Sequence, residues 1–145
     1  MKARGFTLIE LVLVISVIGI LTVLAVPGYQ AIVFRARAAE ARMMLSAIAN
    51  AELAYYRDHG QYLAAAPSTS TGGVPKAPVA FDTSRPSWKQ LGVRAEGLVR
   101  YRYSVVLAAG TFKAVAEGDL DADGQASSFE LDGATLAISV RDELE

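Results

Sequence analysis

The sequence predicts an α+β protein: one long N-terminal helix, whose first half enters a membrane and whose second half packs against a small antiparallel β-sheet. Three observations support this prediction. An apolar run near the start is long enough to cross a bilayer, a helical pattern continues beyond it to about His59, and alternating apolar and polar residues follow from about residue 98. The chain of 145 residues has no cysteine, which excludes disulfides and thiolate metal sites.

The apolar run extends from Phe6 to Val26, and Lys2 and Arg4 precede it. About 20 helical residues span about 30 Å, the thickness of the hydrocarbon core of a bilayer. Three interpretations fit this pattern: a secretory signal cleaved after a small residue such as Ala25, a plain signal anchor, or a membrane helix with a specific use for its one charge. The charged residue inside the run counts against a cleaved secretory signal, and so does the helical pattern that continues past it.

That charge belongs to Glu10, and an ionised carboxylate near the centre of a membrane helix costs about 2.5–3.5 kcal/mol. One explanation is local. Thr7 and Glu10 have the spacing of a capping box, in which each side chain accepts a hydrogen bond from a free N–H group of the first helical turn. The capping box explains why a helix begins here, but it does not explain why the apolar run contains a charge.

The residues Lys2-Ala3-Arg4-Gly5 and Phe6-Thr7-Leu8-Ile9-Glu10 resemble the leader and mature start of type IV pilins and of the pseudopilins of type II secretion. The resemblance continues through Val26-Pro27-Gly28-Tyr29. It implies a pilin-like fold and a structural, non-enzymatic subunit. It also implies that a prepilin peptidase cleaves after Gly5 and that Phe6 then becomes N-methylated.

The same resemblance implies the partners and the location of the chain. The precursor would cross the inner membrane once, in contact with lipid, and assembly machinery in that membrane would then polymerise it with other pilin subunits into a filament at the cell surface. The assembly residues implied are Phe6, Thr7, Glu10 and Pro27. Glu10 would face the ammonium group of a neighbour's Phe6, because two charges in a low-dielectric medium are less costly as a pair than alone.

These observations divide the chain into a leader (1–5), a membrane and filament-core helix (6–34) and a globular domain (35–145). We expect a kink at Pro27 and a helix end at Gly60. A proline-rich loop should occupy about 61–97, with Trp88 and Leu91 packed on the core. The apolar face expected on the helix beyond the kink consists of Ile32, Val33, Ala36, Met43, Met44, Ala47, Ala51 and Ala54, and it is widened by Phe34, Leu45 and Ile48. We expect its Met43–Ala54 part to pack on the core and the helix from Phe6 to Phe34 to pack against other subunits.

The sheet is expected over about 98–140. Alternation from Val99 to Leu107 predicts a first strand, and Ala109-Gly110 can turn the chain into Thr111–Glu117. Further strands are expected around Ser127–Leu131 and Thr135–Val140, joined by a hairpin turn at Asp132-Gly133.

A short acidic segment matches the spacing of a calcium-binding loop. Its oxygen ligands would be Asp119, Asp121, Asp123, Ser127 at the ninth position and Glu130 at the twelfth. The flanks read as strands rather than the helices of an EF-hand, and an acidic turn is the alternative interpretation. A structural calcium ion is the one cofactor that the sequence suggests.

Composition narrows the classes of function. The net charge of −1 argues against nucleic acid as a required partner, and one histidine without cysteine leaves no common catalytic arrangement. The predicted function is a subunit of a type IV pilus or related filament. A pseudopilin of a periplasmic type II secretion pseudopilus is the first alternative, and a membrane-tethered, calcium-stabilised binding module that acts as a monomer is a more remote one.

Overall fold

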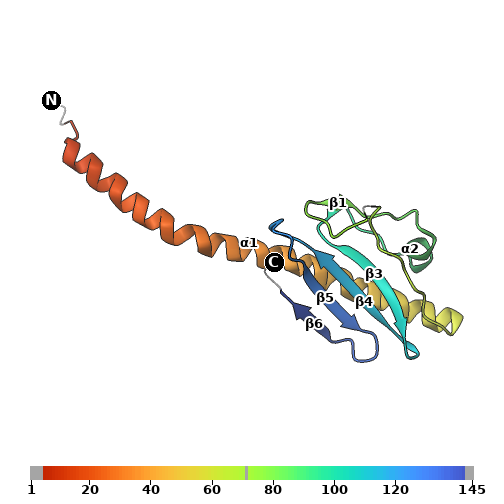
Figure 1. The fold of residues 1–145 in the computed structure, drawn as a ribbon. Coiled ribbons are helices and arrows are strands. Elements are labelled where there is room, and N and C mark those ends of the chain that lie inside the picture. Colours follow the sequence, from red (N-terminus) through yellow and green to blue (C-terminus); the bar gives the residue numbers. More distant parts are fainter. Residues whose placement is uncertain (1–4, 71, 143–145) are drawn as a thin grey trace. The chain divides into compact units, whose positions relative to one another are not determined.

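The computed structural model describes residues 5–70 and 72–142 (Figure 1). Helix α1 spans Leu8–His59, so the helix predicted to end at about His59 is confirmed. The chain divides within α1 into two units, Met1–Val33 and Phe34–Glu145. The side chain of Pro27, where we expected a kink, lies outside the described residues, as do Lys2 and Arg4 of the expected leader.

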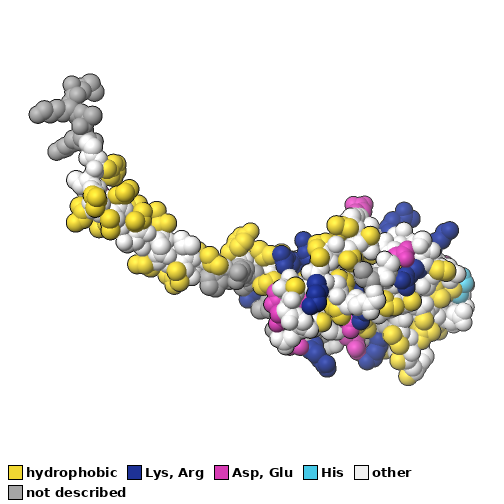
Figure 2. Space-filling view, turned by 45° about the horizontal axis from the view of Figure 1, so that its top comes forward, with side chains coloured by type: hydrophobic (Ala, Val, Ile, Leu, Met, Phe, Trp, Pro, Cys, Tyr) yellow, Lys and Arg dark blue, Asp and Glu magenta, His cyan; other side chains and the backbone are white. Residues whose placement is uncertain are grey.

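The first unit is an apolar helix without a core of its own. Its segment Leu8–Val26 has a mean hydropathy of 2.8, and none of it is buried. By length and composition this segment could cross a membrane. Figure 2 shows apolar side chains along this helical segment.

The second unit combines the remainder of α1 with an antiparallel sheet, which confirms the predicted α+β class. Neighbouring strands pair in the order β3-β4-β5-β6, and the C-terminal half of α1 lies along one face of this sheet (Figure 1). The four strands are β3 (Arg102–Ala108), β4 (Thr111–Gly118), β5 (Ser127–Asp132) and β6 (Ile138–Arg141). A second, two-stranded sheet pairs β1 (Val79–Ala80) with β2 (Leu98–Val99), and the short helix α2 (Pro86–Leu91) lies between them in the chain.

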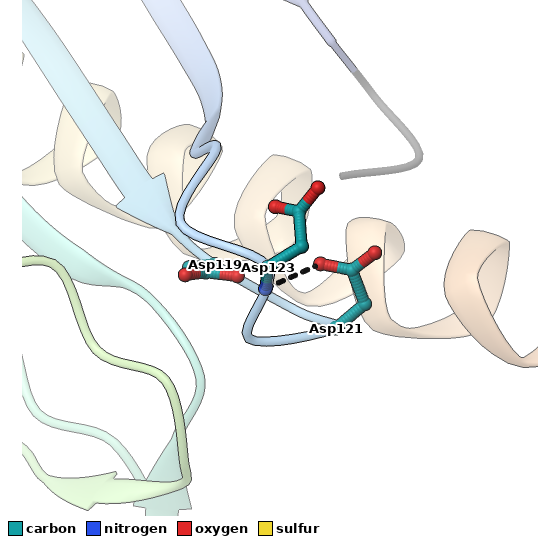
Figure 3. A group of neighbouring side chains, drawn as sticks. All are labelled: Asp119, Asp121 and Asp123. Atoms are coloured by element: carbon teal, nitrogen blue, oxygen red, sulfur yellow. Dashed lines mark hydrogen bonds between the residues drawn. The ribbon is translucent and has the colours of Figure 1, made fainter.

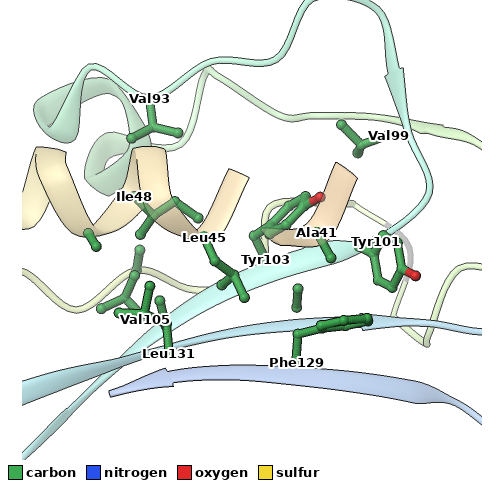
Figure 4. Close-up of a cluster of buried hydrophobic side chains, with 14 of the residues drawn as sticks. Ala41, Leu45, Ile48, Val93, Val99, Tyr101, Tyr103, Val105, Phe129 and Leu131 are labelled. Carbon is green, nitrogen blue, oxygen red and sulfur yellow. The ribbon is translucent and has the colours of Figure 1, made fainter. Parts of the chain in front are cut away.

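The core forms between α1 and the four-stranded sheet (Figure 4). Leu45 and Ile48 are fully buried on the helix, and the small side chains of Ala41 and Ala38 lie about one and two turns before Leu45. Small residues let the helix backbone approach the sheet closely, and the larger pair fills the space beyond them. The strands and the segment that leads into them contribute Tyr101, Tyr103, Val105, Phe112, Phe129 and Leu131.

The helix face that we expected to be buried was therefore wrong in most positions. Met43 is 70% exposed, and Ala47 and Ala54 are exposed as well, whereas Met44 and Ala51 are half-buried against the core. Leu45 and Ile48, which only widened the predicted apolar arc, are its true centre. The helix is apolar around much of its circumference, so periodicity alone did not fix which side faces the sheet.

The two predicted hairpin turns had different outcomes. Ala109 and Gly110 both have positive φ angles, 49° and 80°, as a two-residue turn between twisted strands requires, and they connect β3 to β4 as predicted. The expected tight turn at Asp132-Gly133 was wrong, because β6 begins only at Ile138. A longer loop forms instead, in which the Asp132 carboxylate accepts hydrogen bonds from the backbone N–H groups of Ala134 (2.8 Å) and Thr135 (3.1 Å).

The segment between α1 and β3 begins at Gly60, which ends the helix with a φ of 70°. Trp88 on α2 is fully buried, and its Nε1 donates a hydrogen bond of 2.9 Å to the Ala66 carbonyl. Leu91 is also buried. The prediction that Trp88 and Leu91 hold this proline-rich segment on the core is confirmed.

Glu52 is a buried carboxyl on the core face of α1. Its Oε2 accepts a hydrogen bond of 3.0 Å from the backbone N–H of Leu63, which ties the segment after the helix back to α1. Its Oε1 has no hydrogen-bond partner among the described residues. Burial raises the pKa of Glu52, because the ionised form loses hydration that one hydrogen bond does not replace.

A raised pKa gives a signed prediction for stability. The folded state binds the Glu52 proton more tightly than the unfolded chain does, so the stability linked to this proton is present at low pH and is lost as pH rises through the folded pKa. We expect Glu52→Gln, which keeps an acceptor for Leu63, to melt a few degrees above the wild type at pH 7, with a smaller difference near pH 4. Thermal unfolding followed by Trp88 fluorescence measures this. Exposed Glu96→Gln is the control, and a difference independent of pH would contradict the prediction.

Candidate functional site

The start of α1 is a closed capping box. The Thr7 backbone N–H (3.0 Å) and Oγ1 (2.8 Å) both donate to Glu10 Oε2, and the Glu10 backbone N–H lies 3.3 Å from Thr7 Oγ1. These contacts satisfy N–H groups that the first helical turn leaves free. Both hydrogen bonds of the carboxylate within the described residues use Oε2, so Oε1 remains available to another donor.

Gly5 and Phe6 precede this cap outside any helix or strand and are exposed, with Phe6 85% exposed. A Cβ added at Gly5 would meet no atom within 4 Å. The fold of the described chain therefore does not require glycine at this position. A requirement for glycine would have to come from another molecule.

Two other polar side chains of the apolar helix are satisfied locally. Ser16 Oγ donates to the Val12 carbonyl, and Thr22 Oγ1 donates to the Ile18 carbonyl, both at 2.8 Å. A hydroxyl that bonds to its own helix carries little cost in lipid. Glu10 is thus the one charged side chain within Leu8–Val26, and hydrogen bonds within the helix do not neutralise its charge.

The acidic loop connects β4 to β5 and brings three predicted ligands together (Figure 3). One carboxylate oxygen from each of Asp119, Asp121 and Asp123 lies within 4.8 Å of the others. The Asp121 carboxylate accepts from the backbone N–H of Asp123 at 3.2 Å, and Asp123 accepts from the backbone N–H of Gln125 at 2.7 Å. The hydrogen bonds from Gln125 are the main cause of a lowered pKa at Asp123.

The other two predicted ligands lie outside this group. Ser127 is fully buried, and its Oγ donates to the Gly118 carbonyl at 2.9 Å. Glu130 Oε1 lies 2.5 Å from Lys113 Nζ across the sheet. Both residues belong to β5, where side chains alternate between the two faces, whereas in an EF-hand a helix begins at this point and turns the twelfth residue back to the ion.

The structure adds one residue that sequence spacing could not reveal. Lys76 Nζ lies 3.3 Å from Asp119 Oδ2, and the backbone N–H of Asp119 donates to the Pro75 carbonyl at 3.0 Å. The contact brings the proline-rich segment to the start of the acidic loop. Lys76 and Asp119 also line a cavity of about 230 Å³.

His59, the one histidine of the sequence, has no part in either group. It is exposed at the end of α1, and its ring stacks on Tyr55 with 4.0 Å between the ring centroids.

Comparison with known proteins identifies the N-terminal motif. The family model of the prokaryotic N-terminal methylation motif matches residues 1–26. A fimbrial protein of Neisseria meningitidis is 41% identical over 68 residues, which cover 47% of this chain and 38% of the relative. A type IV major pilin protein PilE1 of Neisseria gonorrhoeae is 42% identical over 59 residues (41% and 36%), and the type IV major pilin protein PilA of Myxococcus xanthus is 36% identical over 61 residues (42% and 28%).

The matched region thus spans well under half the length of each of these relatives. No solved structure gives a significant match. The chain carries the prokaryotic N-terminal methylation motif and is homologous to type IV major pilins and fimbrial proteins.

Proposed function

We propose that this chain is a structural subunit of a type IV pilus or a related filament, made as a membrane-inserted precursor and polymerised through its N-terminal helix. One observation carries the proposal: the methylation motif, matched over residues 1–26, includes an apolar helix, Leu8–Val26, none of which is buried within the described chain. So many exposed apolar side chains are unfavourable in water and have to be buried. Lipid buries them before assembly, and the helices of neighbouring subunits bury them afterwards.

The proposed organisation has three parts. Residues 1–5 are a leader that a prepilin peptidase removes, residues 6–34 are the membrane and filament-core helix, and residues 35–145 are the globular domain. The precursor crosses the inner membrane once, and assembly machinery in that membrane transfers the mature chain to a filament at the cell surface. The pilin and fimbrial relatives favour such a pilus over a periplasmic secretion pseudopilus.

Gly5 and Glu10 have separate roles in this proposal. Gly5 is small because the peptidase must bind the extended chain around the cleaved bond, which agrees with the open space around its Cα. Glu10 keeps Oε1 for the ammonium group that cleavage creates on Phe6 of a neighbouring subunit. Pairing of the two charges in low dielectric selects one register between subunits, because every other register leaves each charge unpaired.

Processing is tested by replacing the glycine. We expect Gly5→Leu to accumulate in the membrane as uncleaved precursor, whereas the wild-type chain should begin with N-methylated Phe6. Gly73→Leu is a matched control, because Gly73 is exposed and a Cβ there also meets nothing within 4 Å. Intact-mass spectrometry distinguishes the products. Retention of residues 1–5 in the wild type, or cleavage near Ala25, would overturn the proposal.

Assembly is tested by separating the charge of Glu10 from its capping role. Glutamine also serves in a capping box, so Glu10→Gln should leave the helix start intact while removing the charge. Thr7→Val does the converse, because it removes the Oγ1 contacts and keeps the carboxylate. We expect Glu10→Gln to reduce sheared filaments at least tenfold and Thr7→Val to reduce them much less, with both proteins inserted normally.

The contrary result is equally clear. If Glu10→Gln assembles at the wild-type level as the only copy of the subunit, the pairing role is wrong. If Thr7→Val causes the larger loss, the carboxylate acts through the helix cap. Glu96→Gln, which removes an exposed charge from the globular unit, is the control for net charge.

A further inference from the structure

We propose that the connection between β4 and β5 binds one calcium ion through Asp119, Asp121 and Asp123, and that the ammonium group of Lys76 competes with the ion for Asp119. The site lies in the second unit and is independent of the N-terminal motif. It goes beyond the filament function, since none of its residues belongs to the segment on which that proposal rests.

The spacing of the three carboxylates fits calcium. Oxygens bound to one calcium ion at about 2.3–2.6 Å can lie up to about 5 Å apart, and the oxygens here lie within 4.8 Å of one another. Magnesium demands near-ideal octahedral geometry at about 2.0–2.1 Å and gives up its water reluctantly, so it is the poorer fit for a set of protein carboxylates.

A second observation concerns the buried carboxylate of Asp119, which is only 3% exposed. Its Oδ2 accepts a hydrogen bond of 3.0 Å from the backbone N–H of Gly124 and contacts Lys76. Its Oδ1 is buried and has no hydrogen-bond partner among the described residues. An unsatisfied carboxylate oxygen is costly to bury, and a cation at this end of the loop would remove the cost.

Lys76 provides only part of the compensating charge. Its side chain is 59% exposed, and within the described residues its Nζ forms one ion pair, with Asp119 Oδ2 at 3.3 Å. Three carboxylates with one ammonium group leave an excess of negative charge on the loop. Arg37 and Arg100 line the same cavity as Lys76, but Arg37 donates to the Leu120 carbonyl and Arg100 pairs with Glu40.

The proposed coordination is open on one side. Ser127 and Glu130 are held by other partners within the sheet, so water and backbone carbonyls must supply the remaining ligands. A site with three monodentate carboxylates and no bidentate glutamate belongs to the weak class of extracellular calcium sites, with a Kd of about 10⁻⁴–10⁻³ M.

Thermal unfolding of the full-length protein in detergent micelles tests this inference. Trp88 is buried in the second unit and is the only tryptophan, so its fluorescence reports the unit that contains the loop. With a Kd of about 1 mM, calcium chloride at about 10 mM should raise the folding equilibrium constant about tenfold over a sample with chelator. Magnesium at the same concentration should have a much smaller effect.

Variants assign the effect to the loop. Asp121→Asn together with Asp123→Asn should abolish the calcium-dependent shift, and both residues are exposed, so the fold should survive. Asp58→Asn together with Glu96→Gln removes the same charge from exposed positions elsewhere and should keep the shift. No shift in the wild type, or an equal shift in the loop variant, would overturn the calcium site.

Lys76→Gln tests the competition. Removing the ammonium group should lower the calcium Kd several-fold, measured by calorimetric titration of the same detergent-solubilised protein. An unchanged or higher Kd would overturn the role of Lys76 and leave the carboxylates as the whole site.

Discussion

The organisation of this protein depends on an apolar helix that its own chain does not cover. Burying an aliphatic side chain gains about 1.5–3 kcal/mol, and the segment Leu8–Val26 leaves this gain unrealised along its whole length. The helical backbone satisfies its own hydrogen bonds, the two hydroxyls bond back to the helix, and Thr7 caps its start. Everything except the charge of Glu10 is therefore compatible with lipid, and in the proposed function that charge selects the register of the partner subunit.

The C-terminal half of the same helix lies in a different environment, because it packs against the sheet. There, alanines allow close approach to the sheet, while Leu45 and Ile48 fill the core. Glu52 holds the following segment through Leu63, and Trp88 holds it again through Ala66. The globular unit thus has a complete core without any contribution from the apolar segment. Its stability and the cover required by the apolar helix are separate physical problems, which is why variants of Glu10 and of Glu52 should affect different measurements.

The acidic loop shows how a motif changes when its flanks change. The spacing from Asp119 to Asp123 lies within a single turn, and the structure brings those carboxylates together. The later positions of the motif depend on a helix that is absent, because β5 directs Ser127 into the core and Glu130 toward Lys113. Three carboxylates without the later ligands of the motif need positive charge from elsewhere in the fold. Lys76, which is distant in sequence, supplies part of it through its contact with Asp119.

The sequence by itself determined the long helix and its end at Gly60, the antiparallel strands, the cap at Thr7 and the grouping of three aspartates, because each depends on residues close together in the chain. It did not determine which side of α1 is buried, since a helix that is apolar over a broad arc can pack on several faces. The longer loop after Asp132 was not predicted from the sequence either. It depends on hydrogen bonds that the Asp132 carboxylate accepts from the backbone N–H groups of Ala134 and Thr135, in place of a two-residue turn. Only tertiary structure decided the burial of Glu52 and the contact of Lys76 with Asp119, since both depend on how segments that are separate in the sequence pack together.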